Sequence, residues 1–413
     1  YRGGNYRQAA RDYAQYLNLT GERRGRTYAL ALYGLGYAQF LQKNYQDAFK
    51  QFTQLQQSYA AASGAIDKTT LADAQMRIGD CYYQSRQYNA AEEAYNKAIN
   101  IEPSVTDYAI YQKAFAQGIT GRYSEKIGTL TYLIESYPQS DYLDDALYEK
   151  GRAYIQLDQG SQAIHVFEQL TTQFPQSQYA PKAGNEIALI HYQNNQIRSA
   201  IKAYKMVILN YPGSEQADIA MRDLKNLYVE ENMVDSYIEF ASQTQGMVKV
   251  DVSERDSLTY KAAELAYTRG DEKAAIDGFT KYLSQFNNGA YIVDAQYYLG
   301  CVYYKQNNYD QARHYLQRVA EHRNSKYCEE ATRTVADLAY NHKDYPLAME
   351  AYGTLIAITN NPQSKLHAQI HRLRSAQALG NYDVIAEETA SVLTNAKLAP
   401  ETAVELRYYR AKA

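Results

Sequence analysis

The stretch that decides the fold is AQYYLGCVYYKQNNYDQARHYL, residues 295–316. On either side of its short polar Asn-Asn turn, small and apolar residues recur at helical spacing, which predicts two helices joined into a hairpin. Gly300 on the first helix and Ala312 on the second are small enough to let the two backbones approach closely where they cross. Tyr303 and Leu316 then fill the space on either side of the crossing.

The same pattern recurs along the whole chain. An alanine stands four residues before an aromatic residue or leucine, and a small residue stands twelve residues before that alanine. The successive small positions lie 35 to 43 residues apart, which indicates a repeat array in which each hairpin buries its apolar face against its neighbours. The strong copies are centred on Gly36, Gly79, Gly151, Ala188, Ala263, Gly300 and Ala336, and the weaker ones on Ala114, Leu224 and Leu373.

Prolines punctuate the array. Pro103, Pro138, Pro175 and Pro212 follow second helices at intervals of 35 to 37 residues, where proline ends a helix. The order small, aromatic, aromatic, Ala, aromatic, Pro resembles the tetratricopeptide repeat over nearly the whole chain. This resemblance implies an all-α fold, an α-α superhelix or solenoid of about ten helical hairpins with partial repeats at both ends. At each end of the sequence the pattern predicts one helix of a hairpin without its partner helix, and we therefore expect this chain to be a piece of a longer array.

The array is uneven, and we expect two lobes. Between 213 and 257 the signature decays, since Leu224 replaces the small residue and Ser236 replaces the alanine. We therefore predict an N-terminal lobe at 1–245, a weak seam at 246–255 and a C-terminal lobe at 256–413. The predicted repeats lie near 28–58, 70–103, 107–138, 144–175, 181–212 and 218–245, then near 256–287, 293–324, 329–361 and 366–397, with a partial one at 401–413.

Composition and motifs restrict the function. With 43 basic and 46 acidic residues the formal net charge is −3, so the chain has no global attraction for nucleic acid. No apolar run in the sequence approaches the ~20 residues that a helix needs to span a bilayer. Catalytic and nucleotide-binding motifs are missing from the sequence, so we expect no enzyme and no cofactor. His367 and His371 have the spacing of two metal ligands on a helix, but no third ligand accompanies them, and we expect no metal site.

Tyrosine is the unusual component, with 44 residues and no tryptophan. In tetratricopeptide arrays the first helix of each hairpin lines a concave groove, and this resemblance selects a set of tyrosines here as groove residues. Tyrosine suits binding surfaces because it combines a large apolar area with a hydroxyl. The alternative is that these rings only pack between neighbouring first helices. The selected tyrosines are Tyr33, Tyr37, Tyr83, Tyr108, Tyr111, Tyr148, Tyr192, Tyr260, Tyr267, Tyr297, Tyr304 and Tyr340, with Phe40 and Phe115 beside them.

The groove positions also indicate the charge of a partner. Tetratricopeptide proteins that grip a C-terminal carboxylate use Lys, Arg and Asn there, whereas this chain has Asp73, Met76 and Asp80. Acidic residues recur at such positions, among them Asp145, Glu264, Glu330 and Asp337. They favour a mixed or basic partner, although a solvated face would also account for them.

The links between hairpins carry a second resemblance. SYPQSDYLDDA (136–146), QFPQSQYAPKA (173–183) and NYPGSEQADIA (210–220) share an aromatic-Pro-x-Ser pattern, and in the first two a further aromatic residue tucks under the next first helix. These links resemble repeats of bacterial envelope proteins such as the outer-membrane assembly lipoprotein BamD and the periplasmic protein CpoB. The resemblance implies a periplasmic or outer-membrane-associated protein.

The functional prediction is therefore a non-enzymatic scaffold that binds a peptide or partner domain in a tyrosine-lined groove, in envelope assembly or maintenance. Possible partners include peptidoglycan and outer-membrane components besides proteins. Two alternatives stay open: a cytoplasmic adaptor or regulator, and a groove that binds a glycan such as peptidoglycan.

Overall fold

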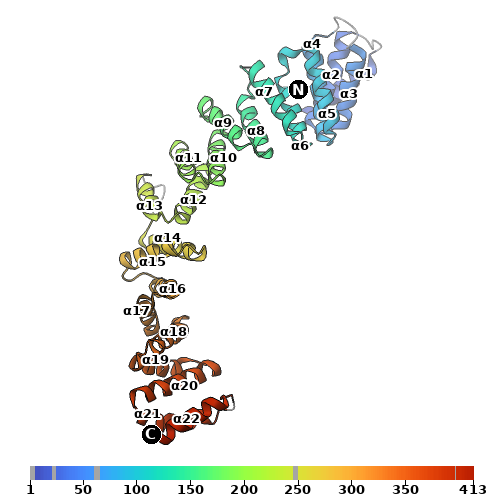
Figure 1. The fold of residues 1–413 in the computed structure, drawn as a ribbon. Helices are drawn as coiled ribbons and strands as arrows, with labels where there is room; N and C mark the ends of the chain where they lie inside the picture. Colours follow the sequence, from blue (N-terminus) through green and yellow to red (C-terminus); the bar gives the residue numbers. More distant parts are fainter. Residues whose placement is uncertain (1–4, 21–24, 60–65, 245–249, 396) are drawn as a thin grey trace. The chain divides into compact units, whose positions relative to one another are not determined.

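The computed structural model describes residues 5–20, 25–59, 66–244, 250–395 and 397–413. Within these ranges the chain forms 22 α-helices and one short 3-10 helix, with no strand (Figure 1). The all-α prediction is therefore confirmed.

The helices follow one another as pairs, and most pack against the next helix in the sequence. We call α2, α4, α6, α8, α10, α12, α14, α16, α18 and α20 the first helices, and the helix after each of them its second helix. Their bounds are α1 (Tyr6–Leu19), α2 (Arg26–Leu41), α3 (Tyr45–Tyr59), α4 (Lys68–Gln84), α5 (Tyr88–Ile101), η1 (Pro103–Val105), α6 (Asp107–Ile119), α7 (Tyr123–Ser136), α8 (Leu143–Gln156), α9 (Gly160–Gln173), α10 (Ala180–Gln193), α11 (Ile197–Asn210), α12 (Glu215–Glu230), α13 (Val234–Gln243), α14 (Val252–Thr268), α15 (Glu272–Gln285), α16 (Ile292–Lys305), α17 (Tyr309–Glu321), α18 (Cys328–Asn341), α19 (Tyr345–Ile358), α20 (Pro362–Leu379), α21 (Tyr382–Leu393) and α22 (Pro400–Lys412).

Ten hairpins with single helices at the two ends make a solenoid of the tetratricopeptide type, as the repeat pattern predicts. The small residues sit where the two helices of a hairpin cross. A Cβ atom added to Gly79 would lie 2.5 Å from the Tyr95 ring, and one added to Gly151 would lie 2.3 Å from the Phe167 ring. Only glycine permits such contacts, because carbon atoms normally pack at 3.5–4.0 Å.

The turn inside every hairpin has one geometry. One residue between the two helices has a positive φ, from 55° to 78°, as in the αL caps that end many helices. The next N–H donates to a carbonyl five residues back, as from Asn308 to Tyr303 at 2.9 Å. Seven of the ten positive-φ residues are not glycine, so glycine alone does not mark these turns. The ten are Lys43, Arg86, Gly121, Asp158, Asn195, Asn232, Gly270, Asn307, Lys343 and Gly380.

The chain divides into two compact units, Tyr1–Met221 and Arg222–Ala413, whose boundary falls within α12. The predicted seam at 246–255 begins among residues 245–249, which lie outside the described part of the chain. The two predicted lobes and their seam stay a prediction.

The core of each unit consists of apolar layers between successive hairpins. In the first unit Phe52, Tyr95 and Phe167 are fully buried, and in the second Phe279 and Tyr352 are. Each of these five aromatic residues is the one that the repeat pattern places four residues after the crossing alanine. Among the described residues, no helix is both long and apolar enough to cross a membrane.

Candidate functional site

Four of the predicted groove tyrosines stack against a second ring that precedes the next first helix. Each pair joins one repeat to the following one, so these four rings order neighbouring hairpins as well as lining the first-helix face. The partner rings were missed as site residues, although the aromatic residue in the links signalled two of them. The ring centroids are 5.1 Å apart for Tyr111 and Tyr142, 4.9 Å for Tyr148 and Tyr179, 4.5 Å for Tyr260 and Tyr291, and 4.0 Å for Tyr297 and Tyr327.

Several tyrosine hydroxyls donate to carboxylates on this face. Tyr111 donates to Asp145 of the next repeat at 3.0 Å, and Tyr260 donates to Glu264 at 3.0 Å. Burial, with the carboxylate beside each hydroxyl, raises the pKa of both tyrosines well above the ordinary value. The hydroxyls therefore stay protonated, and part of the acidic character of the face is used inside the protein.

The densest polar cluster lies on α4. The Arg77 side chain, 17% exposed, forms ion pairs with Asp73 at 3.5 Å and with Asp80. Asp73 also accepts hydrogen bonds from two predicted groove residues, Tyr33 at 2.7 Å and Tyr37. The cluster thus holds two carboxylates and one guanidinium, which leaves one negative charge.

Asp80 connects this cluster to an aromatic hollow. Its Oδ1 accepts hydrogen bonds from Tyr95 at 2.8 Å and from Tyr108 at 3.0 Å. The hollow, about 260 Å³ in volume, brings three predicted groove tyrosines together, Tyr83, Tyr108 and Tyr111. It lies between the first helices α2, α4 and α6, and its other lining residues are Phe40, Asp80, Gln84, Tyr95, Gln112 and Phe115.

A second hollow of about 320 Å³ shares Phe115 with the first and lies between α6, α7 and α8. Its charged lining includes the ion pair between Lys126 and Glu149, whose side chains are 8% and 16% exposed. Arg152 approaches the same glutamate at 4.0 Å. The first-helix face of this unit therefore changes from aromatic to charged within one repeat.

The remaining predicted tyrosines are not gathered into one site. Tyr192 in the first unit and Tyr304 in the second are exposed, at 39% and 47%. Tyr267 packs against Tyr298, and Tyr340 meets the His371 ring edge-on with centroids 4.7 Å apart. The binding role of the twelve tyrosines stays a prediction.

The two histidines singled out by spacing lie together in the second unit. Their ring centroids are 4.3 Å apart, and His367 Nε2 is 3.0 Å from Asp337 Oδ1. Burial lowers the pKa of His371 to about 4. In the described part of the chain, no three His, Cys, Asp or Glu side chains are arranged to hold a metal ion.

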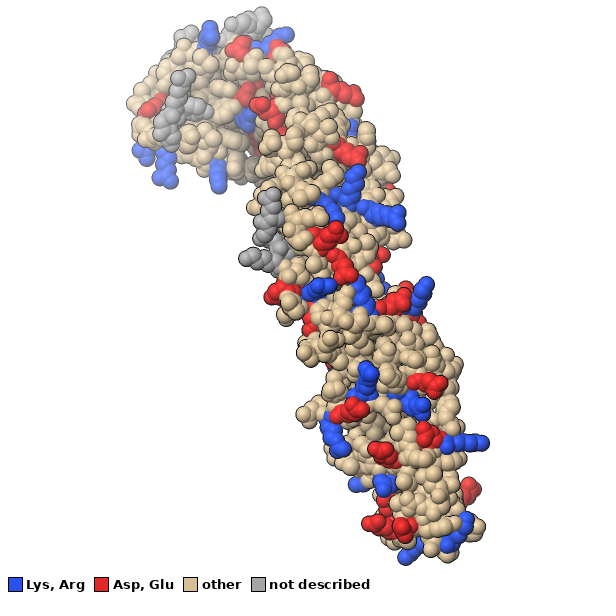
Figure 2. Space-filling model, turned by 90° about the vertical axis from the view of Figure 1, so that its left-hand side faces the viewer, with Lys and Arg blue, Asp and Glu red and all other residues tan. Residues whose placement is uncertain are grey.

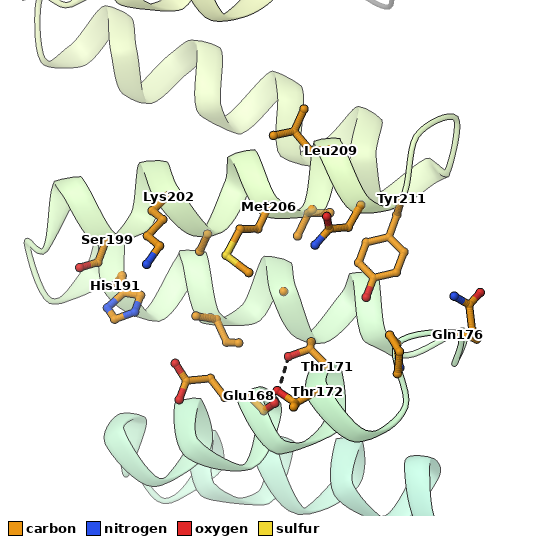
Figure 3. Close-up of a pocket in the computed structure, with 16 residues that line it drawn as sticks. Glu168, Thr171, Thr172, Gln176, His191, Ser199, Lys202, Met206, Leu209 and Tyr211 are labelled. Atoms are coloured by element: carbon orange, nitrogen blue, oxygen red, sulfur yellow. Dashed lines mark hydrogen bonds between the residues drawn. The ribbon is translucent and has the colours of Figure 1, made fainter.

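Figure 3 shows a third hollow, which lies on α9, α10 and α11 and was missed from the sequence. It has a volume of about 720 Å³, and Met206 projects into its middle. Lys202 and His191 face Glu168 at one end, and Tyr211 and Gln176 lie at the other. Glycine at 184 lets α11 approach α10, since a Cβ there would lie 2.4 Å from Val207. In the sequence, the small Gly184 on α10 and the apolar Met206 on α11 are signals that could have pointed to this hollow.

The fold and these surfaces define a helical-repeat protein of the solenoid class. Tetratricopeptide-repeat family models match residues 1–66, 72–105 and 293–325, and the model described as "Outer membrane lipoprotein" (YfiO) matches 143–257. The chain is therefore a tetratricopeptide-repeat protein with a YfiO-type domain.

Several solved structures are also similar to this chain. A tetratricopeptide repeat protein from Parabacteroides merdae is 14% identical, with 66% of this chain and 98% of that chain covered and a TM-score of 0.40. MamA is 16% identical, with 43% and 94% covered and a TM-score of 0.36. The structure of Naa15/Naa10 bound to HypK-THB is 14% identical, with 98% of this chain and 63% of that chain covered and a TM-score of 0.36. The comparison with curated proteins found no match.

Proposed function

We propose that the protein is a non-enzymatic scaffold that holds a peptide or domain of a partner protein against its first helices. The observation that carries this proposal is the aromatic hollow between α2, α4 and α6, where Tyr83, Tyr108 and Tyr111 come together. Tyr111 is held by stacking on Tyr142 and Tyr83 by an edge-on contact with Tyr88, at centroid distances of 5.1 and 5.4 Å. Rings that are already fixed lose little entropy when a partner binds.

The charge pattern supports a protein partner. On the face that Figure 2 shows, acidic and basic side chains are interspersed, with no large patch of one sign. Such a surface lacks the basic stripe that attracts nucleic acid. Tetratricopeptide repeats, moreover, are typical of proteins that act through protein interactions.

We place the scaffold in the bacterial envelope, with a role in assembly or maintenance at the outer membrane. The support is the match of 143–257 to the outer membrane lipoprotein model. A cytoplasmic adaptor is the alternative, and cell fractionation of the full-length protein separates the two locations.

Site-specific photo-crosslinking tests the scaffold. A benzophenone amino acid replaces Gln84 or Gln112 at the hollow, or, as the control, exposed Lys97 on the second helix α5. We expect a discrete protein adduct from the two hollow positions, its recovery with the outer-membrane fraction, and its loss when Tyr83 is also changed to Ala. Equal adducts from Lys97, or adducts from none of the three positions, would contradict the proposal.

A further inference from the structure

The aromatic hollow between α2, α4 and α6 has an unusual lining. Six of its nine lining residues are aromatic, two are glutamines, and Asp80 is the single charged residue. The faces of aromatic rings carry a negative quadrupole, so a ring-lined hollow with a carboxylate attracts cations more than it attracts neutral apolar groups.

Three of these rings already bind cations of the protein itself. The Arg77 guanidinium carbon lies 4.8 Å from the Tyr108 ring centroid and 6.0 Å from the Phe40 centroid, and Lys126 Nζ lies 5.3 Å from the Phe115 centroid. These distances are within the ~6 Å at which a cation over a ring is stabilised. The electrostatics at this place therefore favour cation–π contacts in the folded protein.

The charges around the hollow do not oppose a further cation. Arg77 is outnumbered by its two carboxylate partners, Asp73 and Asp80. Asp145, which accepts the Tyr111 hydroxyl, has no ion pair among the described residues. Adding the neighbouring cations Lys126 and Arg152 and the carboxylate of Glu149 gives four carboxylates and three cations, a net charge of minus one.

We infer that this hollow takes one basic side chain, an arginine or lysine, of the segment that the partner lays on the first helices. The inference rests on the proposed function, because it names the chemistry of that partner. The guanidinium of arginine fits best, since its planar group stacks on rings while its N–H groups donate. The amide oxygens of Gln84 and Gln112 at the hollow are available acceptors, because neither side chain has a hydrogen-bond partner among the described residues.

The test compares pentapeptides that differ only at the central residue. Acetyl-Gly-Gly-Arg-Gly-Gly-amide is titrated with the whole chain by saturation-transfer NMR, beside the same peptide with citrulline, the neutral isostere of arginine. We expect the arginine peptide to bind about tenfold more tightly, within the range measured for cation–π contacts. Equal affinity of the two peptides would overturn the inference.

Two leucine variants test whether the preference for the arginine peptide arises at the aromatic hollow. Tyr83→Leu keeps much of the side-chain volume but removes a ring from the hollow, and it should bring the arginine peptide close to the citrulline affinity. Tyr123→Leu changes a ring of the neighbouring hollow and should bind the arginine peptide like wild type. The assignment of the cation site to this hollow would be overturned if both variants lost the same affinity for the arginine peptide. It would also be overturned if Tyr83→Leu kept the wild-type affinity with unchanged helicity.

The outcome is separable from that of the scaffold proposal. If arginine and citrulline peptides bind alike while crosslinks from Gln112 persist, the partner is held there by contacts other than a cation and only the inference fails. If the arginine preference is found but crosslinks from Gln84, Gln112 and Lys97 are all absent, the cation site stands and the scaffold proposal fails.

Discussion

Replacing the crossing glycine of α8, Gly151→Ala, tests the physical basis of the whole array. Glycine in a helix is about 1 kcal/mol less favourable than alanine, so propensity alone would make this variant more stable. The new Cβ, however, would lie 2.3 Å from the edge of the Phe167 ring, which is fully buried. Relief of this overlap needs a shift of more than ~1 Å in a close-packed layer, because carbon atoms pack at 3.5–4.0 Å.

Overpacking of this kind costs about 1–3 kcal/mol, and the severity of the contact places Gly151→Ala at the upper end. After subtraction of the ~1 kcal/mol gained in helix propensity, we expect a net destabilisation of about 2 kcal/mol. The matched control is Gly128→Ala in α7, where an added Cβ meets nothing within 4 Å. That variant should gain stability by up to ~1 kcal/mol.

The assay is urea unfolding followed by circular dichroism at the helical minimum. The midpoint should fall for Gly151→Ala and rise slightly for Gly128→Ala, which puts the two variants about 3 kcal/mol apart. If both substitutions raise the midpoint equally, the small residues of the repeat do not mark close crossings and the packing argument is refuted.

Three further predictions concern single contacts. Tyr297→Ala, which removes a ring stacked at 4.0 Å on its neighbour, should lower the urea midpoint clearly more than Tyr304→Ala, whose ring is 47% exposed. Burial holds the pKa of His371 at about 4, below its ordinary 6.5, so the unfolded chain binds a proton at this residue before the folded chain does as the pH falls. The free energy of unfolding should therefore decrease between pH 6.5 and 4. In thermal melts, His371→Gln should show a smaller decrease over the same pH range. Glu149→Leu leaves Lys126 buried without its closest carboxylate and should cost about 3–5 kcal/mol in urea unfolding, whereas adding Lys126→Met should restore most of it.

Local features of the amino-acid sequence are enough to predict the hairpins and their order. Helical period, the small crossing residue and the polar turn are local features, so the stretch 295–316 predicts α16 and α17 without reference to any other part of the chain. Local spacing also predicts which tyrosines share one side of a first helix, since the position of a residue around that helix follows from its distance in sequence to the crossing residue. The turn residues at positive φ were harder to recognise, because Lys43 and Lys343 take a conformation that glycine usually marks.

The environment of each tyrosine ring, by contrast, depends on how the hairpins pack against one another. Tyr83 and Tyr148 were selected by the same rule, yet Tyr83 lies at the aromatic hollow while Tyr148 is stacked on Tyr179. The hollow on α9, α10 and α11 likewise depends on how closely Gly184 lets α11 approach. The stacking partner of Tyr148 lies some thirty residues further along the chain, just before the next first helix, and the hollow joins α9 of one repeat to α10 and α11 of the following one. Helical spacing within one repeat carries no information about the repeat beside it.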